Sequence, residues 1–390
     1  MAANKPLTPA EYYKKLSKED RDAVIDLENR KPIDFIPTGS WILNSIIGDG
    51  TLTGKPGGFP RGHIVEVFGD ESSGKTTSLF SVCKQAQDLG GVAVLVDFEY
   101  TFHPEYARRL GLNLKNLVIM QPKHFQHGAR LIKDALAMRP MIIAVDSVSA
   151  MTPREFYEGA VDDTGRIGLQ AQLMSTFLQY ITKFLQESNT CLAFSNQLRS
   201  VIKKSKWETG PDEESSGGRA LKFYSSVRLK FKKGAVEKID TISKFTGKKD
   251  KDPINVTVKV TAVKNKIDKP YMTAPLFIKF GEGFDNISSI IELAINTGVI
   301  KKAGATYSFQ DGEKETFKTT GKQQLWKTLN ENGNLFAKLR ENLVIREDEK
   351  AREEYKNEDE KTDDIEDLLG NVSEKFIEKK NSKTQEPQDD

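Results

Sequence analysis

The 390-residue sequence contains only two cysteines and four histidines, and it has no long apolar run. Cys83 and Cys191 each lie among apolar residues, which favours reduced thiols in a core over a disulfide or a metal site. The histidines lack ligand spacing, so we expect no structural zinc. No stretch reaches the roughly 18 apolar residues of a membrane span, and the first residues lack the apolar segment of a signal peptide. We therefore expect a cytoplasmic protein that has no contact with a membrane.

What the chain does contain is enough apolar residues for a large core. Hydrophobic residues make up 37% of the sequence, and the formal net charge is only +2. A chain of this length predicts one large domain with smaller additions. The small net charge hides an asymmetry, because basic residues concentrate in 199–206 and 219–233, whereas 346–390 is rich in Asp and Glu.

Short strand-like segments alternate with helical segments in the middle of the chain. The expected strands are HIVEVFG, VAVLVDFE, NLVIMQ, MIIAVDSV and TCLAFSNQ. This alternation favours a doubly wound α/β sheet of mostly parallel strands. After Arg219 the segments ALKFYSSVRLKF and INVTVKVTAVKNKI are both strand-like, which predicts an antiparallel extension of the sheet.

The two ends of the chain differ from this core. Thr8, Pro9 and Glu11 have the pattern of a helix start with a capping box, so we expect an N-terminal helical arm that ends near Arg30. Helical patterns follow a compositional boundary at GEGFDN, and the last segment is too charged to pack. The expected divisions are an arm at 1–37, a core at 38–285, a small α+β domain at 286–345 and an acidic mobile tail at 346–390.

The segment GDESSGKT matches the phosphate-binding loop, with a strand before it and a helix after it. Its glycines let backbone N–H groups surround phosphates at a helix N-terminus, Lys75 neutralises their charge, and the Thr76 hydroxyl binds Mg²⁺. A glycine-rich turn that binds nothing is the alternative, and the strand–helix context disfavours it. The expected ligands are ATP and Mg²⁺, and the expected loop contacts are Gly69, Asp70, Glu71, Ser72, Ser73, Gly74, Lys75, Thr76 and Thr77.

Polar residues follow the other predicted strands, at the edge where a doubly wound sheet binds ligands. Asp146 has the context of an acidic residue that holds Mg²⁺ through water, and Glu99 is the better candidate for polarising the attacking water. For Asp97 a role in capping a turn is equally consistent with the sequence. Gln197, which comes after Asn196, is an uncharged amide able to sense a γ-phosphate. Because a long polar segment begins there, Gln197 indicates a switch.

That polar segment has roughly twenty residues, where a compact domain usually connects its elements in about five. Basic side chains within it can contact phosphates, and apolar side chains can stack or wedge against bases. The alternative is a solvated surface loop. The candidate DNA contacts in the segment are Arg199, Ile202, Lys203, Lys204, Lys206 and Trp207.

Several segments besides the phosphate loop carry a family resemblance. They are TGS at 38–40, PEYARRLG at 104–111, VDSVSAMTP at 145–153, NQLR at 196–199, GGRALKFYSSVRL at 217–229, VKNKI at 263–267 and KAGATYS at 302–308. Together with GDESSGKTT they resemble the RecA recombinases, from about the N-terminal arm to the small C-terminal domain. The resemblance implies a P-loop NTPase core and a DNA-dependent ATPase that forms helical filaments on single-stranded DNA and catalyses homologous pairing and strand exchange in recombination and repair.

The resemblance also implies roles for particular residues. Glu99 would activate water, Tyr106 would stack on adenine, and Gln197 would report the γ-phosphate to a second DNA loop at about 198–218. A first DNA loop would lie at 158–169. Its expected contacts are Arg166 and Ile167, and those at the end of the second loop are Gly217, Gly218 and Arg219.

In RecA filaments ATP lies between subunits, so the resemblance implies that Lys264 and Lys266 reach the ATP of a neighbouring subunit. Two residues apart on a strand, both side chains would point to one face. The alternative is that these lysines protect an edge strand from aggregation. The implied partners are single-stranded DNA, homologous double-stranded DNA, other copies of the chain in a head-to-tail filament, and single-strand-binding or mediator proteins that contact the acidic tail.

Some positions depart from the family pattern. His103 replaces an Asp that contacts adenine, the first DNA loop is one residue longer, 48–58 is an insertion, Arg219 replaces an Asn, and 212–214 is acidic. These departures indicate a divergent member, and a bacteriophage is one candidate source of it. The expected location is the cytoplasm of a bacterial cell or of a phage-infected host cell. Two other functions remain open from the residues, namely a hexameric helicase on the same fold and a small-molecule P-loop kinase.

Overall fold

The computed structural model of the protein describes residues 7–23, 32–48, 57–158, 168–200, 213–215, 217–242, 249–311, 314–343 and 346–347. Its contacts divide the chain after Asp34 into a short N-terminal unit and a large second unit. The short unit contains α1 (Pro9–Lys15) and α2 (Lys18–Ala23). Thr8 begins α1 as predicted, because its side chain accepts from the Glu11 N–H while the Glu11 carboxylate accepts from the Thr8 N–H at 2.8 Å. The predicted end of the arm near Arg30 lies outside the described residues.

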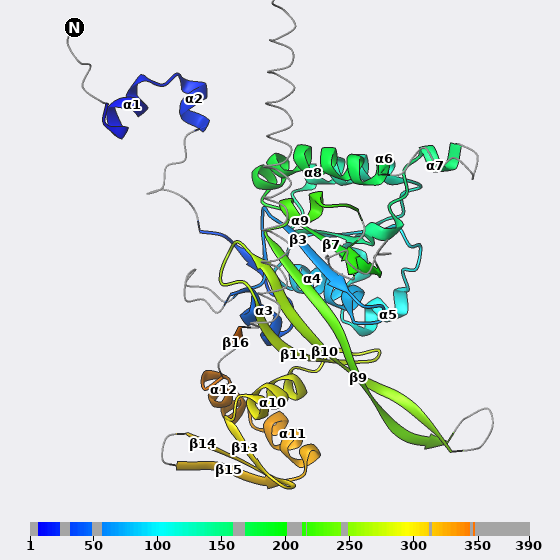
Figure 1. Cartoon of the computed structure of the whole chain (residues 1–390), viewed down its shortest axis with the longest axis vertical. Helices are drawn as coiled ribbons and strands as arrows, with labels where there is room; N and C mark the ends of the chain where they lie inside the picture. The colour runs from blue at the N-terminus through cyan, green and yellow to red at the C-terminus, as the bar shows by residue number, and fades with distance from the viewer. Residues whose placement is uncertain are drawn as a thin grey trace, which may run out of the picture. The chain divides into compact units, whose positions relative to one another are not determined.

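A large mixed sheet organises the second unit (Figure 1). Its strand order is β12-β11-β10-β9-β3-β7-β6-β4-β5, and the strands from β9 to β5 are parallel. The antiparallel β10, β11 and β12 extend it, as predicted. The strands are β3 (Ile64–Gly69), β4 (Ala93–Asp97), β5 (Leu117–Met120), β6 (Ile142–Asp146), β7 (Cys191–Ser200), β9 (Val227–Ile242), β10 (Lys249–Asn265), β11 (Met272–Lys279) and β12 (Gly283–Phe284).

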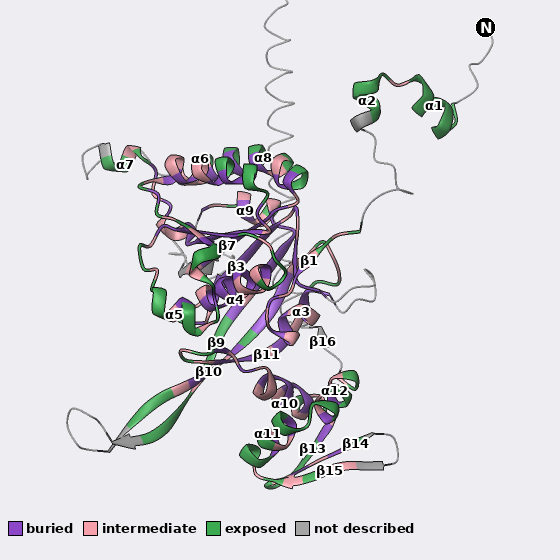
Figure 2. Ribbon diagram, turned by 180° about the vertical axis from the view of Figure 1, so that it is seen from behind, coloured by how far each residue is buried: buried purple, intermediate pink, exposed green. Residues whose placement is uncertain are grey.

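Both faces of the parallel sheet are covered, which makes the sheet doubly wound. Along β4, Ala93 and Leu95 join one apolar cluster while Val94 and Val96 join the other, because successive strand residues point to opposite faces. The first cluster includes residues of α4 (Lys75–Asp88), and the second includes residues of α6 (Phe125–Ala135) and α8 (Leu169–Ser188). Figure 2 shows the central strands as buried. Both cysteines are buried and free, as expected.

Shorter elements connect and flank the sheet. They are β1 (Phe35–Ile36), α3 (Trp41–Ile47), β2 (Phe59–Pro60), α5 (Pro104–Arg109), η1 (Leu114–Asn116), η2 (Leu136–Met138), η3 (Val148–Ala150), α7 (Glu155–Glu158), β8 (Glu213–Ser215), α9 (Ala220–Tyr224) and β16 (Arg346–Glu347). Within the described parts of the chain, no helix is both long enough and apolar enough to cross a membrane.

Two predicted elements differ from the structure. The segment expected to be a strand from Ala220 begins as the helix α9, and β9 starts only at Val227. The reason is local, because 220–226 has no β-branched residue and Leu221 is buried on the helix. In addition, β7 continues to Ser200 and pairs with β8 (Glu213–Ser215), so part of the predicted polar loop forms an antiparallel ribbon.

The C-terminal helices are confirmed, and a small sheet accompanies them. The elements are α10 (Asn286–Asn296), β13 (Ile300–Ala303), β14 (Thr306–Asp311), β15 (Lys314–Thr320), α11 (Lys322–Glu331) and α12 (Gly333–Glu341). Asn286 holds this region to the segment before α3, since its amide donates to the Gly39 carbonyl at 3.0 Å and accepts from the Trp41 N–H at 3.2 Å. The apolar residues of α10 and α11 belong to the same cluster as those of β11.

Candidate functional site

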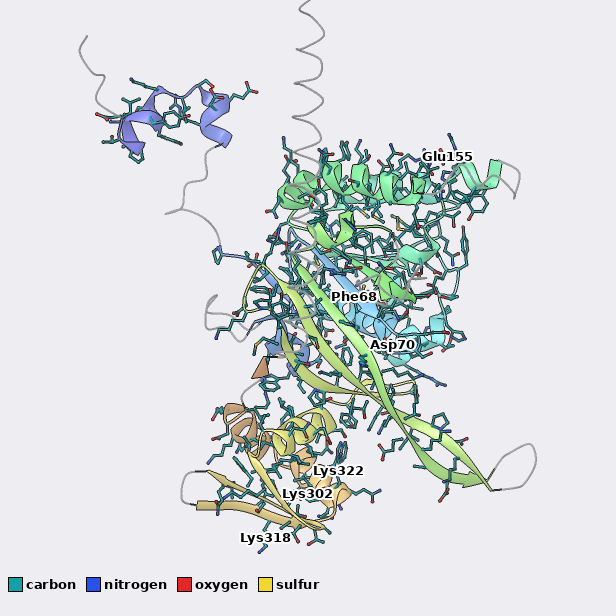
Figure 3. All side chains as sticks on the ribbon, viewed as in Figure 1. Phe68, Asp70, Glu155, Lys302, Lys318 and Lys322 are labelled. Atoms are coloured by element: carbon teal, nitrogen blue, oxygen red, sulfur yellow. The ribbon has the colours of Figure 1, made fainter. Side chains whose placement is uncertain are left out.

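The phosphate loop lies between β3 and α4, as the sequence predicts. Gly69 ends β3 with φ +145°, and a Cβ atom there would lie 1.9 Å from the Phe231 carbonyl oxygen of β9. Asp70 follows it, and the Asp70 carboxylate accepts from the Lys233 N–H at 2.7 Å (Figure 3). The loop is therefore held against β9 at its first turn, and only glycine fits at that junction.

Lys75 is buried at the start of α4 and folds back over the loop. Its ammonium donates to the carbonyl oxygen of Gly69 at 3.0 Å. Burial lowers the pKa of Lys75, and the nearby carboxylates of Asp146, Asp70, Glu99 and Glu71 partly oppose that change. A desolvated cation whose hydrogen bonds go to neutral carbonyls is suited to receive the negative charge of a triphosphate.

Thr76 and Asp146 meet at the carboxyl end of β6. The Thr76 hydroxyl donates to one carboxylate oxygen of Asp146 at 2.7 Å, and the Ser195 hydroxyl donates to the other oxygen. A hydroxyl and a carboxylate are oxygen donors of the kind that Mg²⁺ prefers. This donor set fits the predicted metal role of both residues.

The two carboxylates after β4 have different surroundings. Asp97 is buried and accepts from the N–H groups of Glu99 at 3.1 Å and Phe102 at 3.0 Å, so it caps the turn. Glu99 is half-buried and accepts from the Ser147 hydroxyl, which also contacts Ser149. The turn therefore directs the Glu99 carboxylate toward the carboxyl end of β6.

Groups of the phosphate loop and of the strand ends line one cavity of about 340 Å³, and Asp97 is not among its described lining residues. Glu99 and Gln197 both line it, together with residues 71–77 of the phosphate loop. Tyr106 also lines it, and its hydroxyl hydrogen-bonds to the Thr77 hydroxyl at 2.7 Å. The structure thus brings together the residues predicted for the metal, for water activation and for sensing with most of the predicted phosphate loop, whereas Gly69 and Asp70 are not among the described lining residues.

His103 stands one turn before Tyr106, at the N-cap of α5. Its Nδ1 accepts the Tyr106 backbone N–H at 3.3 Å. A neutral ring that accepts at Nδ1 carries its proton on Nε2, so the exposed edge of the ring donates and does not accept. The aspartate that the family resemblance places at this position would accept instead.

Sequence reasoning missed several lining residues of the cavity. Ser195 lies on β7 two residues before Gln197, and the other residues come from β10, β11 and the residue after β11. No local sequence motif marks the residues from β10 and β11, because the antiparallel pairing of distant strands is what places them beside the phosphate loop. The lining residues that were not predicted are Ser195, Val256, Ile278, Lys279 and Phe280.

The lysines predicted to act on a neighbour lie elsewhere. Lys264 donates to the carbonyl oxygen of Phe223 at 3.0 Å and also to that of Lys222. β10 ends at Asn265, so Lys266 lies past the strand and the alternation argument does not apply to the pair. Neither lysine belongs to the described lining of the cavity. Their role at a neighbour's ATP stays a prediction.

Most of the predicted DNA contacts cannot be placed. Arg166, Ile167, Ile202, Lys203, Lys204, Lys206 and Trp207 lie outside the described residues. The backbone of Arg199 is in β7, where it pairs with Glu214 of β8. Gly217 and Gly218 immediately precede Arg219, which is exposed at the start of α9. The predicted second loop therefore leaves β7 three residues after the cavity-lining Gln197 and returns at α9.

The strand–loop–helix geometry and the cavity define a P-loop nucleoside triphosphatase with a mostly parallel sheet. A family model described as the RecA N-terminal domain matches residues 12–285. The chain is 38% identical to Protein RecA of Thermus thermophilus over 323 residues, which cover 82% of this chain and 87% of that protein. It is also 38% identical to Protein RecA of Heliobacterium modesticaldum over 279 residues, 71% of this chain and 75% of the relative.

The chain belongs to the RecA family. It is a DNA-dependent ATPase that uses ATP with Mg²⁺ and acts in DNA recombination and repair. Like the rest of the family, it binds DNA and forms filaments on it.

Proposed function

We propose that this recombinase couples the state of bound ATP to DNA affinity through Gln197. The observation that carries the proposal is that Gln197 lines the phosphate cavity on β7, while the same strand runs on to Ser200 at the edge of the predicted second DNA loop. A displacement of Gln197 can be transmitted along this continuous strand to the start of the predicted loop. Binding of ATP and binding of DNA would then strengthen each other reciprocally.

Within this proposal each cavity residue has one task. Lys75 and the loop N–H groups bind the β- and γ-phosphates, and Thr76 and Asp146 hold the metal ion, whose charge offsets that of the phosphates. Glu99 orients the attacking water and receives its proton, since its carboxylate faces the same cavity. Hydrolysis removes the contact of Gln197 with the γ-phosphate and lowers the affinity for DNA.

We further propose that the active form is a head-to-tail filament. A heterologous interface generates a helix rather than a closed dimer. Lys264 and Lys266 would reach the ATP of the next subunit, and the N-terminal arm, 1–37, would dock on that subunit. Two hydrogen bonds of Lys264 in this chain go to the neutral carbonyls of Lys222 and Phe223, and a neighbour's phosphates would attract the ammonium more strongly.

The remaining parts are assigned by sequence and by element boundaries. We propose an ATPase core at 38–285, a small C-terminal domain at 286–345 and an acidic tail at 346–390. The start of α10 at Asn286, capped by Asp285, supports the second boundary. The tail would contact single-strand-binding or mediator proteins. The cytoplasm of a bacterial cell, or of a phage-infected host cell, is the proposed location.

The test combines ATPase rates with and without single-stranded DNA, strand exchange, and electron micrographs with a non-hydrolysable ATP analogue. We expect DNA-stimulated hydrolysis, strand exchange and helical filaments. Rings without filaments would favour the helicase, and hydrolysis indifferent to DNA would favour the small-molecule kinase.

Lys75→Ala should abolish ATP-dependent filament formation, because the loop then lacks the buried ammonium that binds the β- and γ-phosphates. Lys84→Ala is the matched control on the same helix, since the Lys84 ammonium pairs with Asp88 at the surface. Unchanged filaments with Lys75→Ala would contradict the role of the phosphate loop.

A further inference from the structure

Three buried polar residues cross the sheet beside the phosphate cavity. Glu66 on β3, Asn196 on β7 and Arg228 on β9 are 0%, 0% and 3% exposed. Their strands are neighbours in the order β9-β3-β7. Charged residues are rarely this deeply buried unless they are paired.

The three side chains form a continuous chain of hydrogen bonds. Arg228 Nε donates to one oxygen of Glu66 at 2.6 Å, and the Asn196 amide donates to the other oxygen at 2.9 Å. The Asn196 carbonyl oxygen then accepts the backbone N–H of Gln197 at 2.9 Å. The guanidinium of Arg228 also lies 4.4 Å from the centre of the Phe68 ring, on the strand that leads into the phosphate loop (Figure 3).

Stability alone does not explain this arrangement. Removing two charges from water costs free energy that their attraction often fails to recover, and apolar residues of similar volume often stabilise a core as well. Apolar contacts do not fix the orientation of the groups that they join, whereas hydrogen bonds do. Each hydrogen bond here fixes an angle, and the last of them fixes the peptide of Gln197, whose Cα is paired with that of Gly69.

We propose that Glu66 is a positioning residue that holds the Gln197 peptide in register with the phosphate loop. Through Asn196 it anchors the strand that carries the sensing amide, and through Arg228 it anchors β9. Arg228 is also the Cα partner of Lys264 on β10, so the network joins the sensor to the strand of the predicted trans-acting lysine. The inference rests on the proposed role of Gln197 and adds Glu66 as the residue that holds Gln197 in position for that role.

Glu66→Gln is the informative substitution because it preserves volume and changes the hydrogen-bond pattern. The carboxylate accepts from both Arg228 and Asn196, whereas the substituted amide has one accepting oxygen and one donating nitrogen. The cationic Arg228 takes the oxygen. The Asn196 amide must then turn, which presents a donor to the Gln197 N–H and loses that hydrogen bond.

The experiment measures single-stranded DNA affinity with and without a non-hydrolysable ATP analogue, and ATP affinity separately. We expect the ATP affinity of Glu66→Gln to lie within about threefold of wild type. The factor by which the ATP analogue raises DNA affinity should be about tenfold smaller than in wild type, since coupling factors are typically about 5–150-fold. Asn196→Leu should give the same result, because it cuts the link and leaves the Glu66–Arg228 pair in place.

Val260→Ala is the control for stability, since it truncates a buried side chain of β10 outside the network. It should lower the melting temperature and keep the full gain in DNA affinity. A wild-type gain in both Glu66→Gln and Asn196→Leu would overturn the inference. If the wild-type protein itself shows no gain, the proposed function of Gln197 fails instead, so the two failures are distinguishable.

Discussion

At the scale of single residues, the site separates groups of the same chemical type by their surroundings. Asp97 ends β4 and Glu99 follows it, yet Asp97 accepts from the turn and from the Gln121 amide while Glu99 faces the cavity. His103 and His124 each cap a helix through Nδ1, but only His103 lies one turn from a cavity-lining tyrosine. A sequence pattern names such residues, and their neighbours decide what they do.

If Glu99 activates water, Glu99→Gln should reduce the rate of ATP hydrolysis by about 10²–10⁴-fold, the usual contribution of a general base. ATP affinity should be retained, because the amide has the size of the carboxylate and the phosphate contacts remain. Steady-state kcat and equilibrium ATP binding test this together. The control is Glu105→Gln, which alters an exposed carboxylate of α5 paired with Arg108. A full-speed Glu99→Gln enzyme would refute the assignment.

His103→Asp should shift the choice of base toward adenine. Asp also caps a helix, but it presents an accepting oxygen to the exocyclic amino group of adenine, where the imidazole presents a donor. One gained hydrogen bond of about 1 kcal/mol predicts an increase of roughly fivefold in the kcat/KM ratio of ATP to GTP. His124→Asp, at the cap of α6, is the matched control and should leave the ratio unchanged. An unaltered ratio in His103→Asp would show that this position does not contact the base.

At the scale of elements, the site depends on how strands end. The phosphate loop leaves β3 where Gly69 touches β9, and Gln197, the proposed sensor, lies on β7 three residues before that strand ends. The antiparallel strands contribute too, since Ile278 and Lys279 of β11 line the cavity. The antiparallel extension therefore forms part of the nucleotide site.

Gly69→Ala should destabilise the protein by more than about 2 kcal/mol, because the new Cβ would overlap the Phe231 carbonyl at 1.9 Å. Gly90→Ala is the comparison, since Gly90 also has a positive φ of +77° but nothing within 4 Å of its Cβ position. We expect a larger fall in melting temperature for Gly69→Ala, measured by thermal unfolding without nucleotide. Equal falls would mean that the contact with β9 relaxes at little cost.

At the scale of the whole molecule, opposite charges gather in different parts of the chain. Basic residues concentrate in 199–206 and 219–233, whereas the residues after Glu347 are mostly acidic or polar. Arg346 and Glu347 themselves form β16, which pairs with β11. A truncation that tests the tail should therefore begin after Glu347 rather than at the predicted boundary of 346.

Deleting residues 348–390 should make DNA binding tighter or faster, because an acidic segment competes with DNA phosphates for the basic surface. The difference should be largest at low salt and shrink as salt screens the charges. Stopped-flow binding of single-stranded DNA at two salt concentrations measures it. A full-length variant with the tail carboxylates changed to amides should behave like the truncation. No change in either protein would leave the tail without a role in DNA binding.

Local chemistry allowed much of the site to be predicted. The phosphate loop, Asp146 and Gln197 could be placed because a loop motif and strand ends are properties of neighbouring residues. The helix α9 was wrongly predicted as part of a strand, since the aromatic residues Phe223 and Tyr224 suit either structure. The sequence predicts that β7 ends at Gln197, whereas it ends at Ser200. The prediction is too short because the last residues of β7 are polar and its pairing partner β8 is distant in sequence.

The sequence by itself determined the alternation of strands and helices, the phosphate loop between β3 and α4, and the family to which the chain belongs. Only the tertiary structure decided which distant residues complete the site. The order of the strands decides that Ser195 donates to Asp146 and that Lys279 lines the cavity. It also decides that Glu66 accepts from both Asn196 and Arg228. The physical reason is that hydrogen bonding between strands follows the order and register of the sheet, which the packing of both its faces selects.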